Sequence, residues 1–131
     1  GYKSDNMNPA YLMTSAAIPK SQRISGIVID AREHAVDPSM SPEVIDMQGN
    51  LVYGTISYSR SKAVNRGPVG YAYSMDDRNV SQRVGANPLF VEAVGSLDDD
   101  VYITSMDAAK VRDAEKSFGV LSNCRVMLLL Q

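Results

Sequence analysis

The sequence predicts an α+β fold, with a single mixed sheet of five to seven strands, one or two helices packed on it and an extended N-terminal arm. Three observations predict this class. Residues 24–31 are rich in β-branched side chains, residues 106–118 carry an apolar stripe at helical spacing, and residues 124–130 form a near-continuous apolar run. We therefore expect two parts, an arm over residues 1–23 and one α+β domain over residues 24–131.

The arm is polar and contains a short apolar patch that includes Tyr11, Leu12 and Met13. Two conformations fit it: a short helix over residues 10–17, or an extended segment lying on its own domain or on a neighbour. A segment too polar to form its own core gains order only by docking. We therefore expect subunit contacts through Tyr2 and the three residues of the patch.

The first half of the domain begins with a strand at residues 24–31, followed by a proline-containing loop over residues 32–41. Residues 43–47 and 51–53 flank the compact turn Gln48-Gly49-Asn50, which predicts a hairpin.

The middle of the domain alternates between weak and clear signals. Residues 57–66 contain few strand formers and end at Gly67, which favours a short helix. Residues 69–73 alternate in the manner of a strand, and the polar residues 75–87 are expected to be mostly loop. Residues 89–94 are expected to form the next strand.

The C-terminal part begins with a strand at residues 101–104, joined to the preceding strand across residues 95–100. A helix follows at 106–118, with Ser105 as its expected N-cap and Gly119 as its stop. Its apolar stripe is expected to lie on a sheet and consists of Ala108, Val111, Ala114 and Phe118. Together with the final apolar run, which suits a central strand covered on both faces, these segments have the length of a β-α-β crossover.

Composition excludes several function classes. Thirteen Lys and Arg against fifteen Asp and Glu give a net charge of −2, which argues against a nucleic-acid binder because such proteins need a basic face. The longest apolar run, residues 126–130, is too short to cross a bilayer. A single cysteine excludes an internal disulfide, and a single histidine removes most hydrolase and metalloenzyme arrangements.

The histidine, His34, lies among carboxylates, so a metal or acid–base role would combine it with Asp30, Glu33 or Asp37. Two further ligands are not evident, and a surface histidine is the favoured interpretation. No Gly-x-Ser-x-Gly elbow presents a serine for a triad. Cys124 is expected to fill the core, since only His34 could serve as its base.

Two charged clusters also favour ordinary roles. The run at residues 98–100 lacks the alternating spacing of a calcium loop, so its aspartates are expected to keep a hairpin tip solvated. Arg60, Lys62 and Arg66 are interpreted as a solvated helix face rather than a ligand clamp, and no glycine-rich phosphate loop is present in the sequence. The sequence therefore predicts no enzyme activity, no cofactor and no metal.

Asp30 and Arg32 form the sharpest polar pair. They are two residues apart, so both lie on the same face if the strand continues. Three interpretations remain open: the pair fixes the following loop, it reaches across a subunit boundary, or it is an exposed pair without consequence.

Several motifs together resemble a bacterial envelope domain, and they lie at residues 27–32 (IVIDAR), 38–46 (PSMSPEVID), 49–54 (GNLVYG), 83–89 (RVGANPL) and 103–111 (ITSMDAAKV). The domain is the C-terminal part of flagellar-associated outer-membrane lipoproteins, the type that builds discs and rings around the motor, and of their relatives. Glu33 stands where this domain usually has a glycine after the Asp-Ala-Arg motif.

The resemblance implies a non-enzymatic structural protein of the periplasm, outer membrane or cell surface of a Gram-negative bacterium. Such a protein self-assembles into a ring, disc or filament, and its partners are copies of itself and other envelope or flagellar components, without nucleic acid or a transmembrane segment. The alternative is a monomeric periplasmic module that binds a small ligand or an envelope polymer through four tyrosines: Tyr53, Tyr58, Tyr71 and Tyr73. An enzyme ranks third and would need His34 beside a serine or Cys124.

Overall fold

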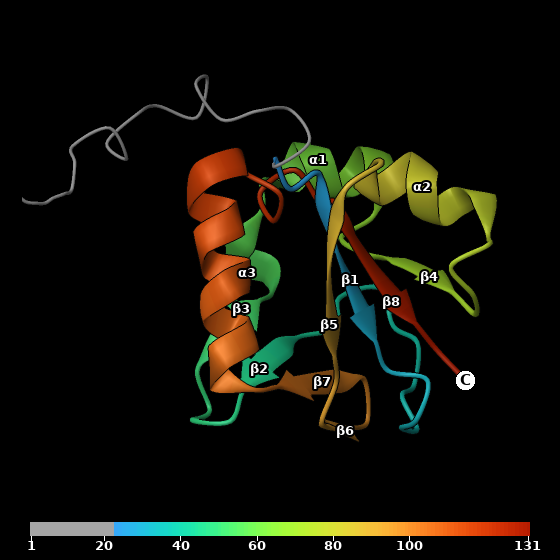
Figure 1. Cartoon of the computed structure of the whole chain (residues 1–131), viewed down its shortest axis with the longest axis vertical. Coiled ribbons are helices and arrows are strands. Elements are labelled where there is room, and N and C mark those ends of the chain that lie inside the picture. Colours follow the sequence, from blue (N-terminus) through green and yellow to red (C-terminus); the bar gives the residue numbers. More distant parts are fainter. Residues whose placement is uncertain (1–22) are drawn as a thin grey trace, which may run out of the picture.

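A computed structural model of the protein describes residues 23–131 and shows an α+β fold with two four-stranded sheets and three α-helices (Figure 1). The α+β class is confirmed, but the expected single sheet of five to seven strands is wrong. Alternation of apolar residues identifies a strand without identifying its neighbour, so it does not show that the strands divide between two sheets.

The first sheet is parallel throughout, with strand order β4-β8-β1-β5. Its strands are β4 (Gly70–Ala72), β8 (Val126–Leu129), β1 (Gly26–Asp30) and β5 (Pro88–Glu92). Every residue of β8 is buried, which confirms the central strand expected near the end of the sequence. The edges of the sheet are β4 and β5.

Both faces of the two central strands are covered, because alternate side chains of β1 and β8 enter two different apolar clusters. Val28, Met127 and Leu129 pack against α2 (Arg78–Val84). The residues between them pack toward α3 (Ser105–Phe118) and the second sheet. In Figure 1, α3 lies on the left and α2 on the upper right, with strands of the first sheet between them.

The second sheet has the order β3-β2-β7-β6 and is mixed. Its strands are β3 (Leu51–Tyr53), β2 (Val44–Asp46), β7 (Asp100–Ile103) and β6 (Gly95–Leu97). The antiparallel β2–β3 pair confirms the predicted hairpin, whose turn places Gly49 at a φ of 84°. The segment expected only to join two strands also contains β6, which pairs with β7 across a turn at Asp98.

Two short helices lie between β3 and β5. The predicted helix after residue 57 is present as α1 (Arg60–Arg66), which follows a 3-10 turn, η5 (Thr55–Ser57), and ends at Gly67. The expectation of mostly loop before β5 is wrong, because α2 forms there. Asp77 caps α2 through its side chain and Gly85 ends it at a φ of 77°, and these two signals were missed.

The long helix α3 confirms the helix predicted at residues 106–118, but its cap differs from the prediction. The Thr104 hydroxyl, rather than that of Ser105, accepts the backbone N–H of Asp107 at 3.0 Å. The expected β-α-β crossover is also wrong, because β7 belongs to the second sheet and β8 to the first. The helix therefore connects two sheets instead of two strands of one sheet.

A buried carboxylate joins α3 to the β2–β3 hairpin. Asp46 is 2% exposed and accepts the backbone N–H groups of Asn50 and Gln48, each at 2.9 Å. Arg112 of α3 donates to its other oxygen at 3.2 Å. These bonds, that of Asn50 foremost, hold the pKa of Asp46 below its ordinary value despite the opposing effect of desolvation.

Replacing Asp46 with asparagine should make the free energy of unfolding less dependent on pH in the acidic range. Because the folded pKa lies below the unfolded one, the carboxylate stabilises the fold above the ordinary pKa, and this contribution disappears as pH falls through the folded pKa. Urea unfolding should show D46N less stable than wild type at pH 7, with the difference shrinking below about pH 4. D113N, at an exposed carboxylate of α3, is the matched control. An equal difference at both pH values would contradict this account.

Candidate functional site

The expected subunit-contact residues fall into two groups. Tyr2, Tyr11, Leu12 and Met13 lie outside the described residues 23–131. Asp30 and Arg32 lie at the carboxyl end of β1 and in the turn that follows it.

Asp30 and Arg32 bind each other through two parallel hydrogen bonds. Arg32 Nε donates to Asp30 Oδ1 at 2.9 Å and Nη2 donates to Oδ2 at 2.8 Å, while the Arg32 backbone N–H also donates to Oδ1 at 3.0 Å. The side-chain bonds lower the pKa of Asp30 and raise that of Arg32. These bonds join the end of β1 to the turn that follows it within one copy, as the first of the three interpretations expects, and the contact across a subunit boundary stays a prediction.

His34 and Cys124 have different surroundings. The His34 ring lies 3.1 Å from the carbonyl oxygen of Ala93, and no group of three metal-ligating side chains occurs within residues 23–131. Cys124 is fully buried, as expected, but it lies in the turn before β8 at a φ of 58° rather than in the strand. Its thiol interacts with Tyr53, whose pKa is raised mainly by burial.

The four tyrosines make different contacts. Tyr53 is buried and donates to the carbonyl of Pro68 at 2.5 Å, and its ring packs on that of Tyr58 at a centroid distance of 5.4 Å. The Tyr71 hydroxyl donates to the carbonyl of residue 39 at 2.7 Å and accepts its N–H at 3.0 Å. Tyr73 is 71% exposed and lines a different cavity from Tyr71.

The two charged clusters behave in part as predicted. The aspartate run lies at the β6–β7 turn, where Asp99 accepts the Ser39 hydroxyl at 2.7 Å. Arg60 is exposed, and the Lys62 ammonium donates to Asn123. The third basic residue, Arg66, instead lines a groove described below.

One of the two edges of the first sheet is formed by β5. The Asn87 carbonyl accepts the backbone N–H of Ser25, the residue before β1, at 3.0 Å. The Ala93 N–H donates to the backbone carbonyl of Asp30 at 2.9 Å. In a parallel pair alternate residues face the same neighbour, so the N–H and C=O groups of Phe90 and Glu92 point away from β1. Within residues 23–131 no strand lies on that side.

Apolar surface lies on both faces of this edge. Phe90 shares a face with Val28, but α2 covers β4, β8 and β1 and leaves Phe90 43% exposed. On the opposite face, a groove of about 310 Å³ separates β5 from α3, and its apolar lining consists of Ile24, Leu89, Ala114 and Phe118. We call β5 with Phe90 and this groove the β5 edge. The sequence predicted the strand but not its edge position, which Pro88 signals, since proline is confined to edge strands and strand starts.

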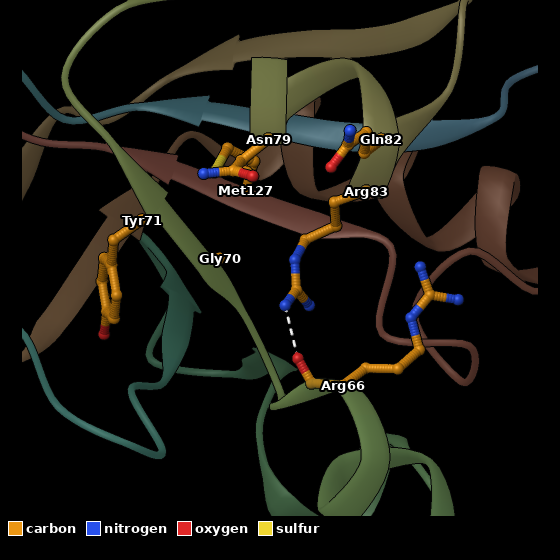
Figure 2. Close-up of a pocket in the computed structure, with 7 residues that line it drawn as sticks. All are labelled: Arg66, Gly70, Tyr71, Asn79, Gln82, Arg83 and Met127. Atoms are coloured by element: carbon orange, nitrogen blue, oxygen red, sulfur yellow. Dashed lines mark hydrogen bonds between the residues drawn. The ribbon is translucent and has the colours of Figure 1, made fainter. Parts of the chain in front are cut away.

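A second surface, the basic groove, lies between α1, α2 and β4 and has a volume of about 410 Å³ (Figure 2). Its lining consists of Arg66, Gly70, Tyr71, Asn79, Gln82, Arg83 and Met127. Asn79, Gln82 and Arg83 come from one face of α2, because residues three and four apart on a helix are neighbours. Figure 2 shows Arg83 reaching from α2 to the end of α1.

Arg83 joins three parts of the chain. Its Nη1 donates to the carbonyls of Gly67 at 3.1 Å and Cys124 at 3.0 Å, and its Nη2 donates to that of Arg66 at 2.5 Å. The bonds to Arg66 and Gly67 satisfy carbonyls that the end of α1 leaves open, and the third bond reaches the turn before β8. The side chain also needs Gly70, because a Cβ there would lie 2.6 Å from Arg83 Nε.

The fold and these two surfaces define a small two-sheet α+β domain with one sheet edge open on both faces. The chain belongs to the family of the second domain of Treponema pallidum Tp0624, which matches residues 26–131. No match was found among curated proteins. Within residues 23–131, no helix is both long and apolar enough to cross a membrane.

Proposed function

We propose that the protein is a non-enzymatic structural component of the bacterial cell envelope that self-assembles into a ring, disc or filament, associated with the flagellar motor. The observation that carries the proposal is the β5 edge, where outward backbone groups lie between an exposed phenylalanine and an apolar groove. Such an edge accepts an added strand, whose alternate side chains pack on opposite faces.

The proposed occupant is the N-terminal arm of a second copy. The arm joins the described chain at Arg23, next to Ile24, which lines the groove. An extended chain from Met13 to Arg23 reaches about 33 Å, enough to leave its own domain. In a strand, Tyr11 and Met13 lie on one face and Leu12 on the other, which matches an edge that presents apolar side chains on each face.

This contact joins two different surfaces, the arm of one copy and the β5 edge of the next. Repeating such a head-to-tail contact closes a ring or continues as a filament. Support for the envelope setting comes from the five motifs that resemble flagellar-associated outer-membrane lipoproteins. The domain at residues 23–131 contains internal ion pairs and capped helices, and these features suit a rigid repeating unit.

Removing the proposed contact should convert an oligomer into a monomer. Light scattering after size exclusion should show concentration-dependent oligomers of the full chain and a monomer for F90D, because the substitution removes the exposed apolar ring and places a carboxylate where the incoming strand would have to desolvate it. Deletion of residues 1–23 should have the same effect. V64D is the matched control, since Val64 is 75% exposed on α1, away from β5.

Two results would contradict the assembly. One is a full-length chain that stays monomeric at every concentration, which would favour the binding-module alternative. The other is an oligomer unchanged by both F90D and the deletion. Circular dichroism should show that all variants keep the wild-type fold, so that a change in size reports on contact and not on unfolding.

A further inference from the structure

The basic groove holds two positive charges without a carboxylate. Arg66 and Arg83 both line it, and none of its other lining residues is acidic. Within residues 23–131, the Arg66 guanidinium forms no hydrogen bond or ion pair, and Arg83 bonds only to backbone carbonyls. On a chain with a net charge of −2, this is a local excess of positive charge.

Each guanidinium keeps donors for a ligand. Of the five N–H donors of Arg83, three are used, so that Nε–H and one N–H of Nη2 have no partner among the described residues. The five N–H donors of the Arg66 guanidinium likewise have no partner among the described residues. The carboxamides of Asn79 and Gln82 line the same groove and are exposed on α2.

Partial burial and the neighbouring charge make this arrangement costly without an anion. Desolvation first, and then the charge of Arg66, lower the pKa of Arg83, which means that the surroundings disfavour its charged form. A bound anion would offset both effects. The groove volume of about 410 Å³ suits a small molecule or a headgroup rather than a single ion.

The number of charges selects the ligand class. Two guanidinium groups balance a dianion, and a phosphate monoester carries a charge of about −1.5 to −2 at pH 7, whereas a single carboxylate carries −1. Three phosphate oxygens also accept more donors than a carboxylate does, and arginine forks match phosphate geometry. We propose that the basic groove binds a phosphate monoester through Arg66, Arg83 and the amides of Asn79 and Gln82.

Titration of the full chain with glycerol 3-phosphate in low salt tests the proposal. Calorimetry should show saturable binding, and acetate at equal ionic strength should not compete. R66A should weaken the affinity at least about tenfold, since one charge-assisted pair is lost. R60A is the matched control: it removes the same charge from the same helix, but Arg60 does not line the groove.

R66A is expected to fold normally because the Arg66 side chain is exposed and, within residues 23–131, forms no hydrogen bond or ion pair that an alanine would break. Vesicles of phosphatidylcholine with phosphatidic acid distinguish the source of the monoester. If the chain binds glycerol 3-phosphate and R66A weakens this binding, the ligand is a free monoester. If the chain instead co-sediments with vesicles that contain phosphatidic acid, but not with phosphatidylcholine alone, and R66A loses this binding, the ligand is a lipid headgroup. No binding to either probe, or equal weakening by R60A and R66A, would overturn the proposal.

Discussion

Replacement of Leu128 by alanine should remove a large part of the stability of the fold. Leu128 is fully buried in the central strand β8, between Ile29 of β1 and Tyr71 of β4, and its side chain belongs to the cluster shared with α3. Buried leucine-to-alanine substitutions cost about 2–5 kcal/mol, against a total of about 5–15 kcal/mol for a domain. Thermal unfolding should show a melting temperature lower by roughly 10–20 °C.

Leu97→Ala is the matched control for this substitution. It removes the same atoms from the edge strand β6, where the side chain is 61% exposed, and should change stability by no more than about 0.5 kcal/mol. If both variants lost the same stability, the assignment of β8 to the centre of the first sheet would be wrong.

Gly26→Val should be about as damaging, for a different reason. A Cβ at Gly26 would lie 2.6 Å from both Cα and Cβ of Val84 and 2.7 Å from its carbonyl oxygen. The end of α2 therefore has to move before any side chain fits at position 26 of β1. We expect the free energy of unfolding to fall by about 3 kcal/mol or more. The affinity of the basic groove for glycerol 3-phosphate should also fall, because α2 carries Arg83.

Gly95→Val provides the comparison, because a Cβ at Gly95 meets no atom within 4 Å. Valine also suits an extended strand, so this variant should unfold close to wild type. A Gly26→Val protein as stable as Gly95→Val would show that α2 does not pack closely on β1.

Elements with strong local signals were predicted, and their partners were not. The β-branched segment at β1, the Gly49 turn and the apolar stripe of α3 each determine a local conformation, and all three are confirmed. The division into two sheets depends on contacts between residues far apart in sequence, which periodicity does not report. Helix α2 was missed because its polar composition outweighed two short capping signals, Asp77 and Gly85.

The candidate site was predictable only in fragments. Asp30 and Arg32 were identified as a pair from their spacing, since residues two apart share a face of a strand. The sequence predicts that Arg66 lies on a solvated helix face. It does not predict the groove, because Arg83 lies on α2, an unexpected helix, and contacts the Arg66 carbonyl only in the folded structure. The outward edge of β5 likewise emerges only once the strand order is known.

The order of strands in the first sheet has a consequence for how the chain folds. The strand that separates β4 from β1 is β8, which is the last of the eight strands that the structure describes within residues 23–131. Until residues 126–129 have been added to the growing chain, β1 lacks one neighbour and β4 has none in that sheet. The first sheet can therefore be completed only after residues 126–129 have been synthesised. Because the pairings of this sheet join residues far apart in sequence, refolding should be slow compared with that of a helical bundle of equal size.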